Sequence, residues 1–563
     1  MHRLLLLGLA TALASSAQPQ TAGSCTTGTA QQFIENPDLR VSLFNTGSLF
    51  FGGSTTSADG YRIPKGQTVQ TQFGERPLSP IFAAVLWLGG EVGGEMRIAA
   101  ARYGGHDFWP GPLNDAATPP PQDCSAHDRI FVVSREDIAH YYATGELAPD
   151  LADWPHQLGA PVIDGDGNPT NYDLRAGDQP DLIGDVAAWW VMNDAGNNHN
   201  PGLPLGVEVR AQAFVYGWTP ETRSPVLSQT TFIRYEVINR GDSVIEPMYA
   251  SMFVDPDLGD AGDDYIGADT LRNMGVVYND SNGDRIYGSP PPAIGIQVLR
   301  GPIGLANGRD DDQDGVVDEA DERLRMTATS TFIGGGPSGT EDPGTPDRYY
   351  NFMQGLWGDG TPYYEFGTGY LQSASGAPIT KFIYAGDPVT ESYFSEVNVD
   401  GNGTDNPQGD RRMAISTGPF RLEPGASDTL LYAFPFGQGS SHLQSVAVLQ
   451  GRAAALQRLT AEGFFASRPV DASALGPAFE LALSRVRPNP SRQPEALLTL
   501  PEATPVRATV LDALGRQLEV VVDGELAEGE SVLTLPRELA PGTYRLRVEV
   551  PGATETLSFT VMR

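Results

Sequence analysis

Acidic side chains gather into short runs in this chain, and these runs have the clearest potential for chemistry. Five stretches alternate Asp or Asn with small residues such as glycine. Calcium takes about six to eight oxygen ligands, and an acidic run around a tight turn places several carboxylates on one side of the chain. Without a cation, carboxylates packed this closely repel one another. The runs therefore predict loops that bind structural calcium.

The run that begins at residue 310 matches a calcium loop best. Its candidate ligands are Asp310, Asp312, Asp314, Asp318 and Asp321. Their spacing follows that of an EF-hand loop, and Gly315 occupies the position of the sharp turn. The flanking segments do not read as a pair of helices. The run therefore resembles the calcium loops of extracellular β-rich repeats more than an EF-hand.

Four further runs are candidates by the same argument: 164–173, 255–269, 280–284 and 398–405. The candidate ligands in the first two of these are Asp164, Asp166, Asn168 and Asp173, and then Asp255, Asp257, Asp263 and Asp264. Asp and Asn also favour turns in which their side chains accept hydrogen bonds from the backbone. Solvated Asx turns are the alternative for every run.

Signatures of enzymes are mostly absent from the sequence. It has no H-E-x-x-H, G-x-S-x-G or P-loop motif, and no Cys/His pair typical of a nucleophile. The seven histidines are dispersed, and only His106 and His199 lie beside aromatic and acidic runs. A glycosidase needs only two suitably spaced carboxylates, however, and the chain has 70 acidic residues. A secreted hydrolase acting on polysaccharide or protein is therefore the alternative to a protein without catalytic activity.

Four tryptophans could line a sugar cleft in such a hydrolase: Trp87, Trp109, Trp189 and Trp190. Large aromatic side chains supply much of the buried apolar area of protein cores. We expect these four to pack in the core.

The formal net charge is −33, and Lys65 and Lys381 are the only lysines. Nucleic acid and anionic lipid both require a basic patch, so this composition argues against either as a partner. An acidic surface suits a solvated extracellular protein that binds cations. A cell-surface or extracellular polymer is a possible partner.

Short strands must position these loops, because 65 Gly and 45 Pro are spread through the chain. Clear strands are predicted at 206–216 and 230–239. In the second, Ile233, Tyr235 and Val237 share the face that a one-sided core would bury. A short helix is predicted at 134–144, capped by Ser134, and one amphipathic helix at 441–464. We expect a mainly β body over residues 18–465, in one or two subdomains.

A separate small domain is predicted over residues 479–563, after a linker at 466–478 rich in Ala, Ser, Pro and Gly. Alternating strands are expected at 506–511, 531–535, 543–550 and 555–562, with turns at 512–515 and 540–542. This pattern predicts an immunoglobulin-like antiparallel β-sandwich.

Three elements of this domain fall in a set order: Arg487-Pro488-Asn489-Pro490, then 510–516 (VLDALGR), then 539–544 (LAPGTY). Together, at the extreme C-terminus, they resemble the type A sorting domain of the Bacteroidota type IX secretion system. The resemblance implies transfer across the outer membrane by the type IX machinery, followed by attachment to the cell surface or release. Motifs of the body, including 86–90 (LWLGG), 189–194 (WWVMND) and 410–413 (DRRM), resemble a group of large secreted proteins from the same bacteria, and imply no activity.

The N-terminus reads as a signal peptide over residues 1–17, with Arg3 before a short apolar run and a small-residue cleavage site at 15–17. In an exported chain, the two cysteines, Cys25 and Cys124, most simply form one disulfide; lipidation of Cys25 is the alternative. The sequence thus predicts a secreted or cell-surface protein with a structural, adhesive or binding role.

Overall fold

The fold is described from a computed structural model of the 563-residue chain. The described residues are 24–53, 60–103, 107–114, 124–165, 167–306, 308, 310, 315–319, 321–333, 336–370, 376–465, 482–487, 495–500, 503–512, 515–527, 529–536, 539–550 and 553–561. The predicted signal peptide and linker lie outside these ranges.

The first large sheet of the body has nine antiparallel strands. Seven follow the order β1 (Gln31–Glu35), β2 (Arg40–Phe44), β3 (Ser48–Leu49), β7 (Ala83–Val92), β16 (Ile245–Asp255), β23 (Met413–Leu422) and β20 (Ala328–Thr331). β4 (Tyr61–Arg62) pairs with β2, and β8 (Glu95–Ala99) pairs with β7. β16 is central, between β7 and β23, so its C-terminal end is held on both sides.

The second large sheet also has nine strands. Its order is β10 (Phe131–Ser134), β13 (Val186–Asn193), β14 (Val207–Val215), β15 (Thr230–Asn239), β24 (Ser427–Gly437), β19 (Ala293–Arg300), β18 (Met274–Asn279) and β17 (Asp264–Asp269), with β9 (Trp109–Pro110) beside β13. Three small hairpins complete the body: β5 (Thr68–Thr71) with β6 (Gly74–Pro77), β11 (Val162–Ile163) with β12 (Gln179–Pro180), and β21 (Tyr363–Tyr364) with β22 (Ile379–Thr380).

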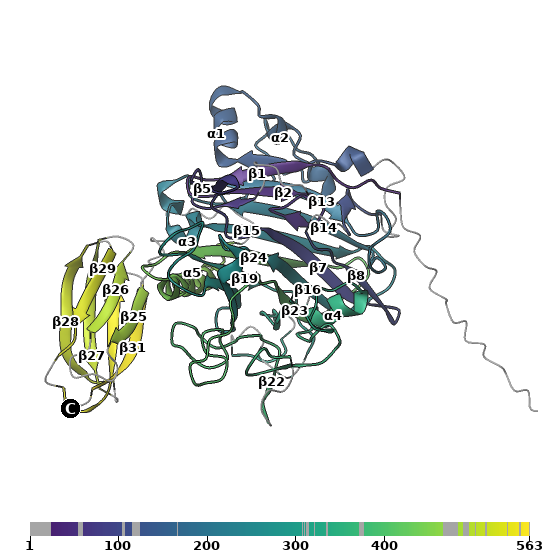
Figure 1. The fold of residues 1–563 in the computed structure, drawn as a ribbon. Coiled ribbons are helices and arrows are strands. Elements are labelled where there is room, and N and C mark those ends of the chain that lie inside the picture. Colours follow the sequence, from purple (N-terminus) through teal and green to yellow (C-terminus); the bar gives the residue numbers. More distant parts are fainter. Residues whose placement is uncertain are drawn as a thin grey trace, which may run out of the picture.

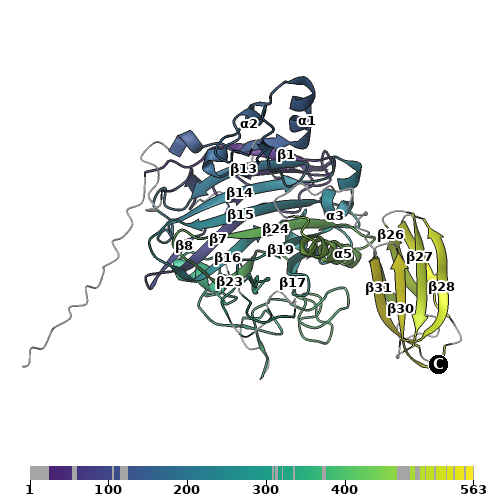
Figure 2. The same ribbon diagram turned by 180° about the vertical axis from the view of Figure 1, so that it is seen from behind.

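The two sheets pack against each other around one large core, to which β7 and β16 contribute from one side and β14, β15 and β24 from the other (Figure 1). Their outer faces are covered too. Helix α4 (Pro346–Met353) packs against the first sheet, where Trp87 stacks on Phe253. Helix α5 (His442–Ala461) lies across β24, β19 and β18 of the second (Figure 2).

Both faces of β15 are covered, so the core there is not one-sided. Ile233, Tyr235 and Val237 are buried between the sheets, as predicted. Phe232 points to the other face and is also buried, in a second core formed with α5 and with the segment that carries α2 (Pro149–Ala152).

Both predicted helices of the body are present. Helix α1 (Arg135–Thr144) starts after Ser134, whose side chain forms a capping box with Asp137. Helix α5 starts after Ser441, whose side chain accepts a hydrogen bond from the amide of Gln444. A one-turn helix, α3 (Pro225–Ser228), precedes β15. None of the helices in the described ranges has the length and apolar character that a membrane crossing requires.

The C-terminal strands form two antiparallel sheets that share a core, which is the predicted sandwich. One contains β25 (Ala482–Arg487), β26 (Glu495–Leu500) and β29 (Gly529–Thr534); the other contains β28 (Gln517–Leu526), β27 (Thr504–Leu511), β30 (Gly542–Val550) and β31 (Ala553–Val561). This sandwich is the yellow unit in Figure 1.

The predicted disulfide between Cys25 and Cys124 is present. It joins the segment before β1 to a 3-10 helix, η1 (Cys124–His127). The backbone amides of Thr29 and Ala30 also donate to the carboxylate of Asp128. The start of the described chain is therefore fixed to the body covalently and by hydrogen bonds.

Candidate metal centre

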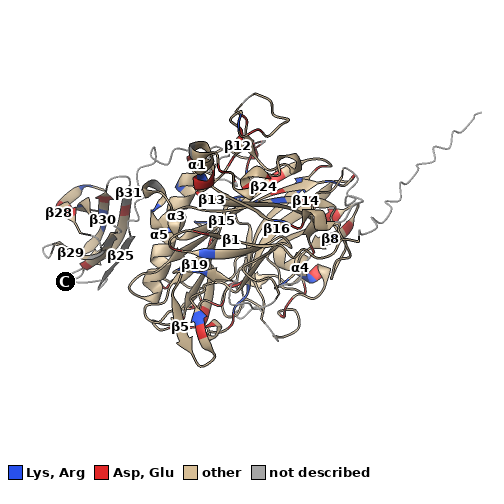
Figure 3. Ribbon diagram, turned by 90° about the horizontal axis from the view of Figure 1, so that it is seen from above, with Lys and Arg blue, Asp and Glu red and all other residues tan. Residues whose placement is uncertain are grey.

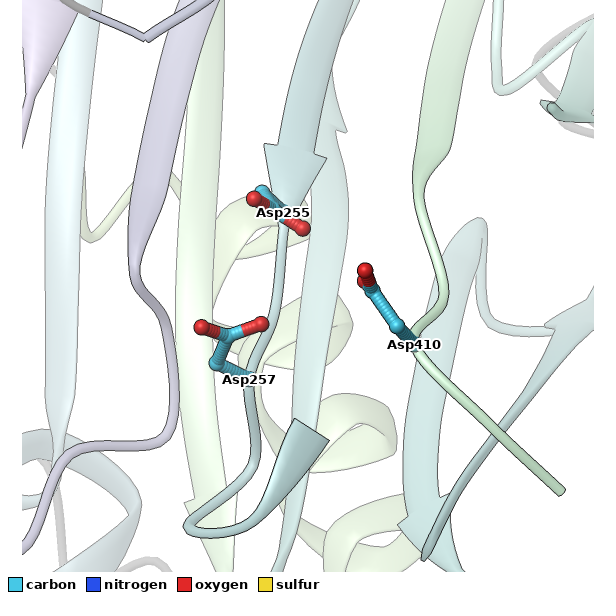
Figure 4. A group of neighbouring side chains, drawn as sticks. All are labelled: Asp255, Asp257 and Asp410. Atoms are coloured by element: carbon cyan, nitrogen blue, oxygen red, sulfur yellow. The ribbon is translucent and has the colours of Figure 1, made fainter. Parts of the chain in front are cut away.

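Three carboxylates meet where the chain crosses from the first sheet to the second. Asp255, Asp257 and Asp410 each offer an oxygen atom, and these atoms all lie within 4.8 Å of one another. Figure 4 shows Asp255 at the end of its strand, Asp257 just beyond it, and Asp410 opposite on a separate segment. Within the described residues, no other group of three or more His, Cys, Asp or Glu side chains meets this criterion.

Sheet pairing brings these residues together. Asp255 is the last residue of β16 and is paired with Ala83 of β7. β23 pairs with β16 on the other side, with Val254 opposite Met413, so the segment just before β23 brings Asp410 alongside. Asp257 adopts a left-handed backbone conformation, with φ 43°. This turn lets the chain leave β16 and start β17 in the other sheet.

Asp255 is the buried member of the group, at 4% exposure, whereas Asp410 is exposed. The Oδ1 atom of Asp255 is buried without a hydrogen-bond partner. The guanidinium of Arg412 contacts two of the three carboxylates. Its Nη2 lies 2.9 Å from Asp410 Oδ2, and its Nε lies 3.8 Å from Asp255 Oδ1. The Arg412 Nε also donates to the hydroxyl of Tyr103 at 2.7 Å.

The electrostatics of the group disfavour its fully ionised state. Burial, together with the charges of Asp257 and Asp410, raises the pKa of Asp255 to about 8. Burial, together with the charge of Asp410, raises the pKa of Asp257 to about 6. Burial raises the pKa of Tyr103 to about 12, and the charge of Asp255 adds to this. The carboxylates therefore lack sufficient positive charge to balance them.

A divalent cation would supply that charge. Two oxygens bound to one calcium ion lie at most about 5.2 Å apart, twice the longest usual bond of about 2.6 Å, so the observed spacing needs little adjustment. Three carboxylates and the guanidinium of Arg412 leave two uncompensated negative charges when all are ionised. All the ligand atoms are oxygens, which hard cations such as calcium prefer.

The remaining acidic residues of this loop lie beside the group but are not part of it. Asp264 is fully buried, and its Oδ2 accepts from the amide of Leu258 at 3.0 Å. Burial raises its pKa well above the ordinary value. Burial and the charges of Asp284 and Asp260 raise the pKa of Asp263 to about 7. The whole crossover is thus short of positive charge.

The loop at 164–173 is organised by hydrogen bonds to its own backbone. Asp164 Oδ1 accepts from the amides of Gly167 and Asn168, and Asp173 Oδ1 accepts from the amide of Arg175. A buried aspartate that follows the loop, Asp178, also holds it: its carboxylate accepts hydrogen bonds from the amides of Gly165 and Asp173. The contacts of Asp164 and Asp173 are local contacts to following amides, as in Asx turns. Asp166 lies outside the described residues, and calcium binding here stays a prediction.

Five of the twelve residues in the loop at 310–321 lie outside the described residues, Asp312 and Asp314 among them. Asp310 accepts from the amide of Gly315 at 3.0 Å, and Asp318 accepts from the amide of Gly308 at 3.0 Å. Asp321 is exposed. The calcium prediction for this run stays untested.

Asp410 and Arg412 were not among the sequence-predicted ligands. Their 410–413 motif marked a resemblance to secreted proteins, but the acidic runs alone gave no reason to pair it with Asp255. Its contribution depends on the pairing of β16 with β23, which local sequence does not encode.

The candidate catalytic and sugar-binding residues of the sequence have structural roles where they are described. Both ring nitrogens of His199 contact backbone oxygens, of Ile98 and Asp194, and its side chain is buried. His106 lies outside the described residues. The four tryptophans considered for a sugar cleft are at most 3% exposed and belong to the core, as expected.

Comparisons with known proteins identify no family. No family model and no curated protein matches the chain. A polysaccharide lyase of known structure aligns over 95% of this chain and 47% of its own, with 10% identity and a TM-score of 0.24. This chain therefore spans about half the length of that lyase. The adhesin domain of Epf from Streptococcus pyogenes aligns over 59% of this chain and 80% of its own, with 8% identity and a TM-score of 0.11.

Proposed function

We propose that this chain is an exported, non-enzymatic protein, secreted or held at the cell surface, whose β body is stabilised by calcium. Its role is structural, adhesive or binding. The observation that carries the calcium proposal is the group of Asp255, Asp257 and Asp410, with a buried Asp255 oxygen that lacks a hydrogen-bond partner. Burying a carboxylate is costly when its contacting cation, Arg412, lies 3.8 Å away and is shared with Asp410, and a bound cation reduces that cost.

Calcium should raise the melting temperature (Tm) of the full mature chain relative to chelator. At calcium about a hundredfold above Kd, binding adds about 2.7 kcal/mol, or about 3 °C for a cooperative body of this size. The D410N variant should lose most of this gain, because Asp410 is an exposed ligand whose neutralisation leaves the core intact. Differential scanning calorimetry with calcium or EDTA measures both.

D242N is the matched control, since Asp242 is an exposed residue in the turn between β15 and β16. It should respond to calcium as the natural chain does. An unchanged Tm in EDTA, or an equal calcium response in D410N and D242N, would refute the proposal.

The stabilisation by calcium should grow with pH. The pKa of Asp255 is about 8 in the folded chain, against about 3.9 when unfolded. Between these values the folded, calcium-free chain binds a proton that the unfolded chain does not, so its stability falls as pH rises from about 4 to about 8. Calcium requires the ionised carboxylates and competes with those protons. The Tm gain should therefore be larger at pH 8 than at pH 5; equal gains would contradict this assignment.

The export part of the proposal rests on the sequence of the two ends. The three elements at 487–490, 510–516 and 539–544 resemble a type IX sorting domain, and the described strands there form the β-sandwich that the strand pattern predicts. The partner implied is the type IX secretion machinery.

A secreted hydrolase is the second candidate, because the three close carboxylates could also serve acid–base chemistry. A pKa of about 8 keeps Asp255 protonated at neutral pH, as a general acid must be. Its 4% exposure argues against direct contact with a polymer substrate. Hydrolysis of polysaccharide or protein by the natural chain that D255N abolishes would favour this candidate over the first.

A further inference from the structure

Trp218 differs from every other tryptophan of the chain. It is 49% exposed, whereas the other six of the seven are at most 3% exposed. A large apolar ring on the surface costs solvation free energy unless something covers it. Trp218 follows β14, on the part of the second sheet that lies beside α1 and β1.

The indole is held in place rather than free to rotate. Its Nε1 donates to the backbone oxygen of Glu35 at 3.0 Å. The backbone amide of Trp218 donates to the buried carboxylate of Asp185 at 3.0 Å. The hydroxyl of Thr222 donates to the same carboxylate at 2.6 Å and holds it in place. A ring ordered in this way loses little entropy when a ligand packs on it.

Trp218 lines a hollow of about 740 Å³, which is in the size range of small-ligand sites. Phe33 forms another part of its wall, and the Arg40 guanidinium lies 4.1 Å from the centre of that ring. The first turn of α1 contributes Arg135 and Glu136. Figure 3 shows basic and acidic segments side by side on α1.

The charged groups around the hollow offer donors and acceptors together. Arg40 lies 3.6 Å from Glu35, and its Nε is buried without a hydrogen-bond partner. The Nε of Arg135 donates to the oxygen of Gly184 at 2.9 Å. Among the lining residues, four are acidic and two are basic, and the ammonium of Lys65 lies 5.8 Å from the centre of the Trp218 ring, so acidic groups outnumber basic ones by four to three. An anionic ligand would meet net repulsion there, so the charge balance favours an uncharged one.

We propose that this hollow binds a pyranose ring of a neutral polysaccharide. The C–H face of a pyranose is apolar and flat enough to pack on an indole. Its hydroxyl groups both donate and accept, so they can pair with carboxylates and guanidinium groups at once. The hollow shares no residue with the Asp255 group, so the site goes beyond the calcium proposal and does not depend on it.

The test is affinity electrophoresis of the full mature chain through gels that contain one polysaccharide each: mannan, xylan, laminarin or dextran, with dextran sulfate as the anionic probe. At least one neutral polymer should retard the natural chain. W218A should weaken that binding at least about tenfold, since buried tryptophans often dominate binding free energy. F73A is the matched control, because Phe73 is 78% exposed at the tip of the β5–β6 hairpin and does not line the hollow; it should bind normally.

A second variant and a second readout guard against a folding defect. W218F keeps an aromatic ring and should bind more tightly than W218A, and both should keep the Tm and the calcium response of the natural chain. The retarding polymer should also protect Trp218 fluorescence from acrylamide. Retardation by no neutral polymer, by dextran sulfate alone, or equally for the natural chain and folded W218A would overturn the proposal.

Discussion

Truncation of the chain after residue 478 should abolish its appearance outside the cell in a host with a type IX secretion system. The sorting-domain resemblance rests on residues 487–544, and the described strands beyond residue 481 form a sandwich with its own core. The body should therefore still fold without it and accumulate in the periplasm. Immunoblots of the periplasmic and extracellular fractions measure the outcome.

Fusion of residues 466–563 to an unrelated periplasmic carrier is the complementary control, and should carry that protein outside. A truncated body that still reaches the cell exterior would show that the C-terminal sandwich is not the export signal. The result is independent of calcium, because no residue of the Asp255 group lies in the removed segment.

Loss of the disulfide should cause the largest change in stability of any substitution considered. The bond between Cys25 and Cys124 closes a loop with a sequence separation of 99. Chain entropy assigns such a loop about 4–5 kcal/mol. We expect a smaller loss of stability from the C25A/C124A variant, about 3 kcal/mol. The pairing of strand β1 and the hydrogen bonds from the backbone amides of Thr29 and Ala30 to Asp128 still fix the segment.

Urea unfolding of the natural chain with and without reductant, beside C25A/C124A, measures this difference. The reduced natural chain and the double variant should unfold at the same urea concentration, below that of the oxidised chain. Coincident curves for all three would contradict a stabilising role. Detection of a lipid on Cys25 by mass spectrometry would instead support the alternative fate of that residue.

Much of the local structure could be predicted because its signals are local. The Ser134 cap of α1, the helical periodicity after Ser441 and the alternation in β15 each reside in a short stretch of sequence. The same alternation did not reveal that the second face of β15 is covered as well. Phe232 is buried as deeply as Ile233, because α5 and the segment around α2 cover the sheet face that a one-sided core would leave to solvent.

The candidate site could be predicted only in part, for a physical reason. Sequence identified the 255–264 loop as acidic but could not rank its carboxylates, because their burial is set by tertiary packing. It also could not place Asp410 against Asp255, since that contact follows from the pairing of β16 with β23. Asp178 was missed for a similar reason: its burial is set by tertiary packing, and one of the amides it accepts from, that of Gly165, lies well before it along the chain.

We expect calcium to occupy the group of Asp255, Asp257 and Asp410 at the crossover between the two sheets. The most direct measurement is a crystal structure of the mature chain grown with calcium, with anomalous data collected at long wavelength. We expect an anomalous peak at about 2.3–2.6 Å from oxygens of Asp255, Asp257 and Asp410. Well-defined density for those three side chains without such a peak, at saturating calcium, would contradict it.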